Sequence, residues 1–388
     1  MRLSNRALSI AESETLRLAS ELAGLRRSGQ DVVSFLEGEP DLPVPEPIQQ
    51  ATIQALLSGQ TRYSNSSGLP ELKALIVKKL EDQNKIKVAD ENMLIANGAK
   101  QALYDALQAL CDQGDEVIIC KPYWVTFPEA ARLAGATPVF VETLDHQLDL
   151  GKIAAAITHK TKAIILNSPN NPTGAVYSKA ALKEVATLAV KHDFFIISDE
   201  AYEHLVYDGL RHESIAALGN QAAKKTITIQ TFSKSFSMTG FRVGYLAAHA
   251  EIVRAISRLH GHVTGNVCTF AQHGAIAALA LDQNYFEERR AIFQKRRDLA
   301  FALALRSFDC AKPQGAFYLF ADVRRYLGRQ FEDSAQLAAH LLRKGRVAVV
   351  PGAACGMEGY LRISFSTSEE NICKGFERIE GALCRLAS

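Results

Sequence analysis

A lysine lies just beyond an apolar run in the segment TFSKSFSMTGFRVG, residues 231–244. Lys234 is flanked by the hydroxyls of Thr231 and Ser233, and Arg242 follows it on the same segment. A lysine amine becomes a nucleophile once its pKa is lowered, whereas hydroxyl and guanidinium groups donate hydrogen bonds to phosphate. The segment therefore predicts an amine held beside a bound phosphate group.

Polar and aromatic residues also follow four other predicted strands. The strand NMLIAN precedes a helix that opens with Gly98, Ala99 and Lys100; the strands DEVIIC, KAIILN and FFIISDE lead to Trp124, to Asn171, and to Asp199 with Tyr202. In open α/β sheets, ligands bind beyond the carboxyl ends of the strands. These side chains are therefore expected to meet in one crevice.

The chemistry of these groups matches one cofactor. Free backbone N–H groups at the start of the helix at residue 98 suit a phosphate. Asp199 leaves a buried strand and needs a cationic partner, such as a protonated ring nitrogen. Tyr202 and Asn171 can hydrogen-bond a ring substituent, Trp124 can stack on a ring, and Lys234 can react with an aldehyde. Together these groups describe pyridoxal 5′-phosphate.

The elements that would position this site alternate along the chain. From about residue 92, short β-rich runs alternate with helical patterns, which predicts a mostly parallel central sheet covered by helices. After long helical patterns, the last third returns to short strands such as AFYLFAD and LRISFS. The sequence thus predicts an α/β fold with a large cofactor-binding domain over 46–285 and a small α+β domain over 286–388. The N-terminal segment 1–45 is expected to join the small domain.

Composition excludes several classes of protein. The chain has 388 residues and a formal net charge of +2, which argues against a nucleic-acid-binding surface. Its seven cysteines are scattered, so neither a disulfide framework nor a metal site is expected. No signal peptide is visible and no apolar run approaches the length needed to cross a membrane, so a cytoplasmic protein is expected. A dinucleotide-binding dehydrogenase is disfavoured because no G-x-G-x-x-G follows a strand.

Four motifs carry a resemblance that spans nearly the whole chain. NSPNNPTG, SDEAYEHLVYDG, SKSFSMTGFRVGY and RISFSTSEEN resemble the class I, fold-type I aminotransferases, and most closely their bacterial aspartate/prephenate branch. The resemblance implies pyridoxal phosphate, a homodimer with shared active sites, and ping-pong transfer of an amino group from an L-amino acid to a 2-oxo acid. Aspartate or glutamate is the expected donor.

The resemblance also implies a role for each site residue. Lys234 would form the Schiff base, Asp199 would pair with the ring nitrogen, and Tyr202 would bond the 3-oxygen; these three are the expected catalytic residues. The remaining cofactor contacts would come from Gly98, Ala99, Lys100, Trp124, Asn171, Thr231, Ser233, Arg242 and, across the dimer, Tyr63. The substrate would be bound by Arg362 through its α-carboxylate, by Lys100 through its side-chain carboxylate, and by Gly38, Trp124 and Asn171.

Other interpretations stay open at this point. The same lysine, aspartate and arginine would serve an aromatic or prephenate aminotransferase, or a lyase or cyclase with the same cofactor. Individually, Asp199 could be a helix cap, Arg362 a solvent-facing strand residue and Lys100 a solvated lysine. The segment 259–274 departs from the branch pattern, which leaves the distal substrate pocket open; His262 is expected to be an interface histidine.

Overall fold

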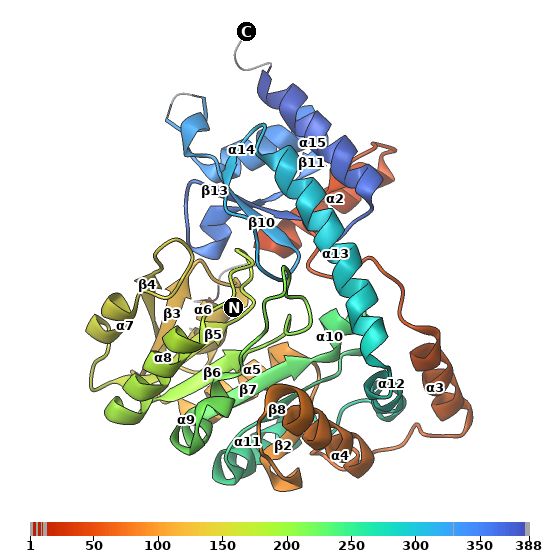
Figure 1. Ribbon diagram of the computed structural model, residues 1–388, viewed down its shortest axis with the longest axis vertical. Helices are drawn as coiled ribbons and strands as arrows, with labels where there is room; N and C mark the ends of the chain where they lie inside the picture. Colours follow the sequence, from red (N-terminus) through yellow and green to blue (C-terminus); the bar gives the residue numbers. More distant parts are fainter. Residues whose placement is uncertain (1–2, 5–6, 9, 11–13, 329, 385–388) are drawn as a thin grey trace.

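The computed structural model describes residues 3–4, 7–8, 10, 14–328 and 330–384. It has a larger part built on a seven-stranded sheet and a smaller part built on a four-stranded sheet, joined by the long helix α13 (Gln283–Ala304) (Figure 1). The predicted α/β fold class is confirmed. Within the described residues, no helix is long and apolar enough to span a bilayer.

The large sheet is parallel except at one strand. Its order is β2 (Met93–Ala96), β8 (Gly244–Ala247), β7 (Thr226–Thr231), β6 (Phe195–Asp199), β5 (Thr161–Asn167), β3 (Glu116–Lys121) and β4 (Thr137–Glu142). Only β8 runs antiparallel to its neighbours. The central strands are buried almost throughout because both of their faces are covered, as parallel sheets require.

Helices cover both faces of this sheet. One face packs on α5 (Ala99–Leu110), α6 (Thr126–Leu133) and α11 (Ala250–Val263). The other face packs on helices that include α3 (Glu46–Leu57), α4 (Pro70–Lys79), α8 (Lys179–His192), α9 (Asn220–Lys225) and α12 (Thr269–Leu279), with α7 (Leu150–Ala155) at the side of β4. Successive residues of a strand face opposite sides. Ile118 and Ile119 of β3 accordingly belong to different cores.

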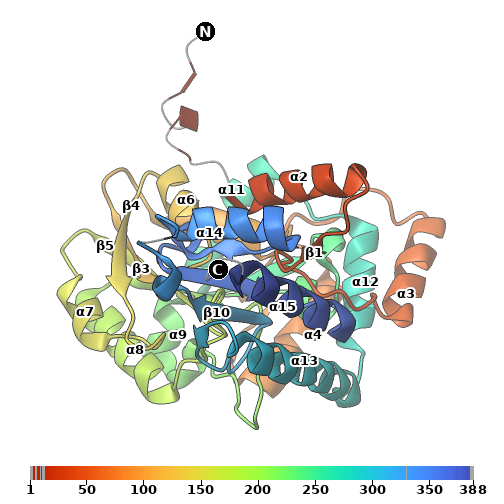
Figure 2. The ribbon, with the colours of Figure 1, turned by 90° about the horizontal axis from the view of Figure 1, so that it is seen from above.

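The smaller part gathers both ends of the chain. Its antiparallel sheet has the order β12 (Val350–Pro351), β13 (Tyr360–Ser364), β10 (Tyr318–Asp322) and β9 (Asp309–Cys310), and it packs with α14 (Ser334–His340) and α15 (Glu369–Cys384). Near the N-terminus, β1 (Val33–Ser34) pairs with β11 (Val347–Ala348), and α2 (Glu14–Arg27) lies alongside. Seen from above, these elements lie over the large sheet (Figure 2). The domain limits at residues 45 and 285 stay predictions.

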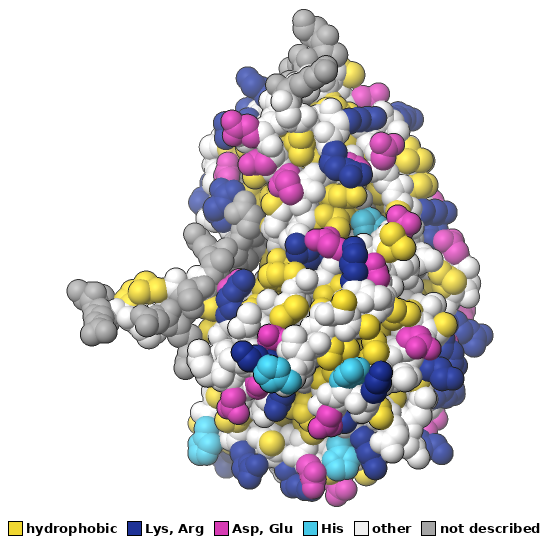
Figure 3. All heavy atoms as spheres, turned by 90° about the vertical axis from the view of Figure 1, so that its left-hand side faces the viewer, with side chains coloured by type: hydrophobic (Ala, Val, Ile, Leu, Met, Phe, Trp, Pro, Cys, Tyr) yellow, Lys and Arg dark blue, Asp and Glu magenta, His cyan; other side chains and the backbone are white. Residues whose placement is uncertain are grey.

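The side of the molecule that carries α7 and α8 shows a mixed surface. Lys and Arg side chains are interspersed with Asp and Glu on this face, and no large area of one sign dominates it (Figure 3). Such mixing agrees with the near-zero net charge of the whole chain. The pocket between the two parts is lined by four cations, Lys100, Lys234, Arg242 and Arg362.

Candidate active site

A pocket of about 640 Å³ lies between the carboxyl ends of the central strands and the smaller part. Three strands supply it directly, because β5 ends at Asn167, β6 at Asp199 and β7 at Thr231. The residues named from the sequence that line this pocket are Gly38, Ala99, Lys100, Trp124, Asn171, Asp199, Tyr202, Thr231, Ser233, Lys234, Arg242 and Arg362. Gly98 lies just beneath it, and Tyr63 lies outside it with 96% of its surface exposed.

One end of the pocket is built to receive an anion. Gly98 is the N-cap of α5 with φ +78°, and a Cβ added there would lie 2.4 Å from Nη2 of Arg242. Arg242 is itself left-handed (φ +56°) and donates to the carbonyls of Thr239 (2.9 Å) and Asn97 (3.1 Å), so no carboxylate takes its charge in the described residues. The helix start, the guanidinium and the neighbouring hydroxyl of Ser233 fit a phosphate.

The centre of the pocket holds a buried acid and a half-buried amine. Burial raises the pKa of Asp199 to about 7, although the Ala201 N–H, 3.1 Å from Oδ1, and the charge of Lys234 oppose this. Lys234 lies in the short helix α10 (Phe232–Ser235), and its Nζ donates to the carbonyl of Gly38. Burial lowers the pKa of Lys234 to about 8 despite the carboxylates of Glu39 and Asp199. A cation beside this carboxyl would favour its ionised form, and a protonated ring nitrogen would supply one.

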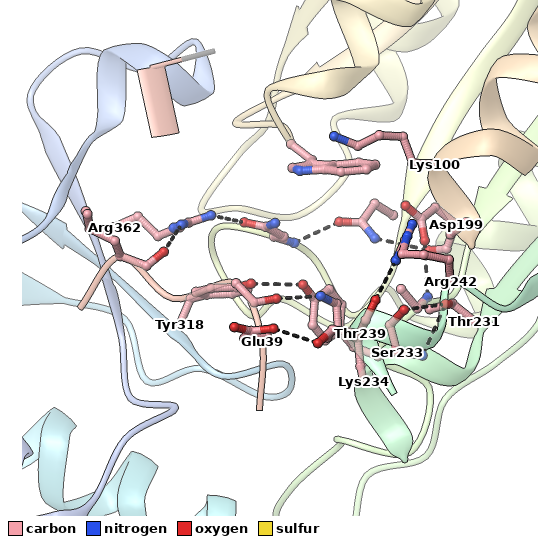
Figure 4. Close-up of a pocket in the computed structure, with 18 residues that line it drawn as sticks. Glu39, Lys100, Asp199, Thr231, Ser233, Lys234, Thr239, Arg242, Tyr318 and Arg362 are labelled. Atoms are coloured by element: carbon pink, nitrogen blue, oxygen red, sulfur yellow. Dashed lines mark hydrogen bonds between the residues drawn. The ribbon is translucent and has the colours of Figure 1, made fainter. Parts of the chain in front are cut away.

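The opposite end of the pocket is formed by Arg362 of β13 (Figure 4). Only 4% of Arg362 is exposed, so the alternative of a solvent-facing strand residue is wrong. Nη1 donates to Oδ1 of Asn171 (3.2 Å), Nη2 donates to the carbonyl of Leu36 (2.9 Å), and the guanidinium lies 4.6 Å from the ring centroid of Tyr318. Its buried Nε has no partner in the described residues. This guanidinium is thus held in place with spare donor capacity.

A second cation borders the pocket near the phosphate end. Nζ of Lys100 lies 5.1 Å from the ring centroid of Trp124 and forms no ion pair within the described part of the chain. Burial lowers the pKa of Lys100, and the positive charge of Arg242 adds to that effect. A cation placed beside another cation, with no carboxylate nearby, favours an incoming anion.

The sequence alone did not identify several residues that line the pocket. Glu39 accepts a hydrogen bond from the Thr239 hydroxyl (2.6 Å), and the hydroxyl of Tyr318 lies 2.9 Å from that of Tyr202. Asn167 ends β5, and its side-chain amide donates to the Asp199 carbonyl (3.1 Å). The signal for Asn167 was available, because it is the last residue of a strand beside β6. Glu39 and Tyr318 reach the pocket only through tertiary folding of the smaller part.

The segment 259–274 forms the end of α11, the connection to α12 and the first part of α12. His260 is fully buried, with Nδ1 2.8 Å from Oδ2 of Asp105 on α5. His262 is exposed in the single chain. In this chain alone, none of these histidines lines the pocket.

Comparison with known proteins agrees with this architecture. Residues 30–379 match the family model for class I and II aminotransferases. A probable aspartate/prephenate aminotransferase of Aquifex aeolicus is 41% identical, with 98% of each chain covered, and the aspartate aminotransferase of Bacillus subtilis is 38% identical over 98% of each. The structure of Thermus thermophilus aspartate aminotransferase with maleate superposes with a TM-score of 0.93 at 39% identity, covering 98% of this chain and 100% of that one.

A lysine-centred pocket at the carboxyl edge of this sheet defines a group-transfer enzyme of the aminotransferase fold. The chain belongs to the class I and II aminotransferase family. Within that family it is an aminotransferase of the aspartate aminotransferase type.

Proposed function

We propose that the protein uses pyridoxal 5′-phosphate to move the amino group of L-aspartate or L-glutamate to a 2-oxo acid. The observation that carries the choice of substrate is the presence of two cations, Lys100 and Arg362, in one pocket without a carboxylate partner in the described residues. A substrate with two carboxylates satisfies both. The related Thermus structure with maleate, a dicarboxylate, supports the same class of ligand.

The residues of the pocket fit the cofactor group by group. Gly98, Ala99, Thr231, Ser233 and Arg242 would hold the phosphate. Asp199 would keep a proton at the ring nitrogen, while the hydroxyl of Tyr202 and the amide of Asn171 would bond the ring oxygen. When bound, the cofactor supplies an aldehyde for the amino group and an aromatic ring that accepts electrons from the substrate Cα.

The protein groups then perform three tasks. Arg362 would bind the α-carboxylate with its planar donor pair, which orients the substrate for loss of its Cα proton. Lys234 would accept that proton at Nζ, because an amine with a pKa of about 8 is partly neutral near physiological pH. Lys100 would select a side-chain carboxylate. Leu36 and Trp124 line the same pocket and would limit the access of water.

A second candidate is a prephenate aminotransferase. The Aquifex relative is named a probable aspartate/prephenate aminotransferase. Prephenate also carries a second carboxylate, so the same two cations would accept it. Steady-state assays with L-aspartate as donor and either prephenate or 2-oxoglutarate as acceptor distinguish the two. Turnover with 2-oxoglutarate alone supports the first candidate, and turnover with both supports a dual enzyme. Failure with both acceptors contradicts the proposal.

We further propose that the protein is a homodimer. We place it in the cytoplasm, because its cysteines are free thiols, which suit a reducing compartment. Backbone and side chains around Tyr63 are fixed by hydrogen bonds from Thr269 to the Arg62 carbonyl (2.8 Å) and from Asn266 to Ser64 (3.2 Å), yet the Tyr63 ring is exposed. An ordered, exposed aromatic ring suits a partner subunit, and Tyr63 would there reach the partner's phosphate. A chain that sediments as a monomer while fully active would contradict this assignment.

A further inference from the structure

The end of β6 and the turn that follows it present their side chains to two environments. Asp199 and Tyr202 line the pocket, whereas Glu200 and Glu203 point into the protein interior beyond it. Glu200 is 1% exposed, and the side chain of Glu203 is 11% exposed. Two carboxylates buried this deeply are costly unless each is paired and hydrogen-bonded.

Glu203 is paired with Lys79, the last residue of α4. Nζ of Lys79 contacts Oε1 of Glu203 and also donates to Asn84 (2.9 Å) and Gln230 (2.6 Å). The amides of Asn84 and Gln230 in turn donate to Oε2 of Glu203 at 2.8 and 3.0 Å. Burial opposes ionisation of Glu203, but the charge of Lys79 outweighs it and holds the pKa at about 2. The pair is therefore ionised.

Glu200 is anchored on all sides as well. Its Oε1 accepts from Ser198 (2.9 Å), and its Oε2 accepts from Ser214 (2.7 Å) and Gln230 (2.9 Å). Nε2 of His212 lies 3.0 Å from the same Oε2, and although burial disfavours the cation, Glu200 raises the pKa of His212. Two carboxylates are thus balanced by Lys79 and His212.

Gln230 joins the two halves of this network. It is the residue of β7 that precedes Thr231 of the phosphate end, and its amide contacts Glu200, Glu203 and Lys79. The hydroxyl of Tyr245 on β8 donates to the same amide oxygen. The network therefore connects α4, the turn after β6, and the ends of β7 and β8. A contribution to folding stability does not by itself explain this buried network, because well-packed apolar residues often replace a buried ion pair without loss of stability.

We propose that Glu200 and Glu203, with Lys79, Gln230 and His212, are positioning residues that set the orientation of Asp199 and Tyr202 toward the cofactor ring. Rotation of the turn would break the contacts of both glutamates together, so the two pocket side chains are held in one arrangement. The inference rests on the proposed function, since Asp199 and Tyr202 are assigned there to the ring nitrogen and the ring oxygen.

The test uses reconstituted full-length protein and two readouts other than turnover. One is the dissociation constant of pyridoxal 5′-phosphate, and the other is the pH midpoint of the visible band of the bound cofactor. A misplaced Asp199 carboxylate would leave the ring nitrogen less protonated. With less positive charge on the ring, the nitrogen of Lys234 would keep its proton to a higher pH. The midpoint should therefore rise.

Lys79→Met leaves the Glu203 carboxylate buried without its lysine partner, whereas Lys79→Met/Glu203→Met removes both charges. We expect the single variant to lose stability, to bind the cofactor roughly tenfold to a hundredfold more weakly, and to raise the midpoint by about one unit. The double variant should regain stability but keep the raised midpoint. Lys73→Met is the matched control, because Lys73 lies on the same helix as Lys79 and its pair is with Asp90 (2.8 Å), outside the network; this variant should leave the midpoint unchanged.

A double variant with the wild-type midpoint and affinity would overturn the inference, and so would an equal shift in the Lys73 control. If the single variant does not fold, Ser198→Ala replaces it, since it deletes one donor to Glu200 and should give a smaller shift of the same sign. A pH midpoint that stays at the wild-type value in the double variant, or in Ser198→Ala, overturns the inference. Wild-type protein that binds no pyridoxal phosphate would instead contradict the proposed function, so the two failures are distinguishable.

Discussion

Replacing Lys100 tests the choice of a dicarboxylate substrate. Lys100→Met keeps a side chain of similar length against Trp124 but removes the charge. A hydrogen bond to a charged group contributes about 1.5–3 kcal/mol, and the lower value suits a lysine that is partly open to solvent. That value corresponds to a roughly tenfold loss in the rate constant for aspartate. The loss for phenylalanine should be much smaller, because its side chain carries no carboxylate.

The assay is the half-reaction of the cofactor-loaded enzyme with one amino acid at a time, followed by stopped-flow absorbance without a 2-oxo acid. Because no dicarboxylate acceptor is present, the measured rate constant reports on the amino-acid donor alone. Lys152→Met serves as the control, because Lys152 lies on the surface in α7 and pairs with Asp149 (3.8 Å). Equal losses with aspartate and phenylalanine, or no loss with either, would refute the assignment of Lys100.

Three further predictions concern the centre of the pocket. Because burial raises the pKa of Asp199 from 3.8 to about 7, its ionisation destabilises the apoprotein as pH rises through that window. Asp199→Asn should therefore raise the melting temperature of the apoprotein at pH 8 and have little effect near pH 4; an unchanged melting temperature at pH 8 would contradict the buried carboxyl. In the apoprotein, acylation of Lys234, followed by mass spectrometry, should show a midpoint near pH 8, and a midpoint near 10.5 would show an unperturbed amine. Arg362→Lys should slow the half-reaction by roughly a hundredfold for every amino acid, and a loss confined to aspartate would refute its α-carboxylate role.

The pocket could be predicted from the sequence where it depends on strand ends. The runs KAIILN, FFIISDE and TITIQT have apolar or β-branched residues at most positions and are buried almost throughout, and the polar residues that end them must lie at one edge. The positions of Asp199, Asn171 and Lys234 in one pocket follow from that rule, while the roles of these residues stay predictions. The antiparallel course of β8 was not predicted, since alternation of strands and helices does not reveal strand direction.

Other features depend on contacts between distant residues, which no local pattern reports. Glu39 reaches the pocket because β1 pairs with β11 and brings the N-terminal segment beside it. His260 could not be assigned from its surroundings in sequence; its partner, Asp105, lies on another helix. The partners of Glu200 and Glu203 come from α4, β7 and the loop at Ser214, so the sequence showed two acids in a motif and nothing of their network.

The central claim is that Lys234 and the surrounding groups bind pyridoxal phosphate and transfer an amino group to it. The most direct test is the visible spectrum of the reconstituted protein, recorded before and after addition of L-aspartate without a 2-oxo acid. We predict a yellow protein whose band disappears with aspartate, while Lys234→Ala lacks the covalently bound form. A protein that stays colourless after reconstitution, or a yellow one that no amino acid bleaches, would contradict the claim.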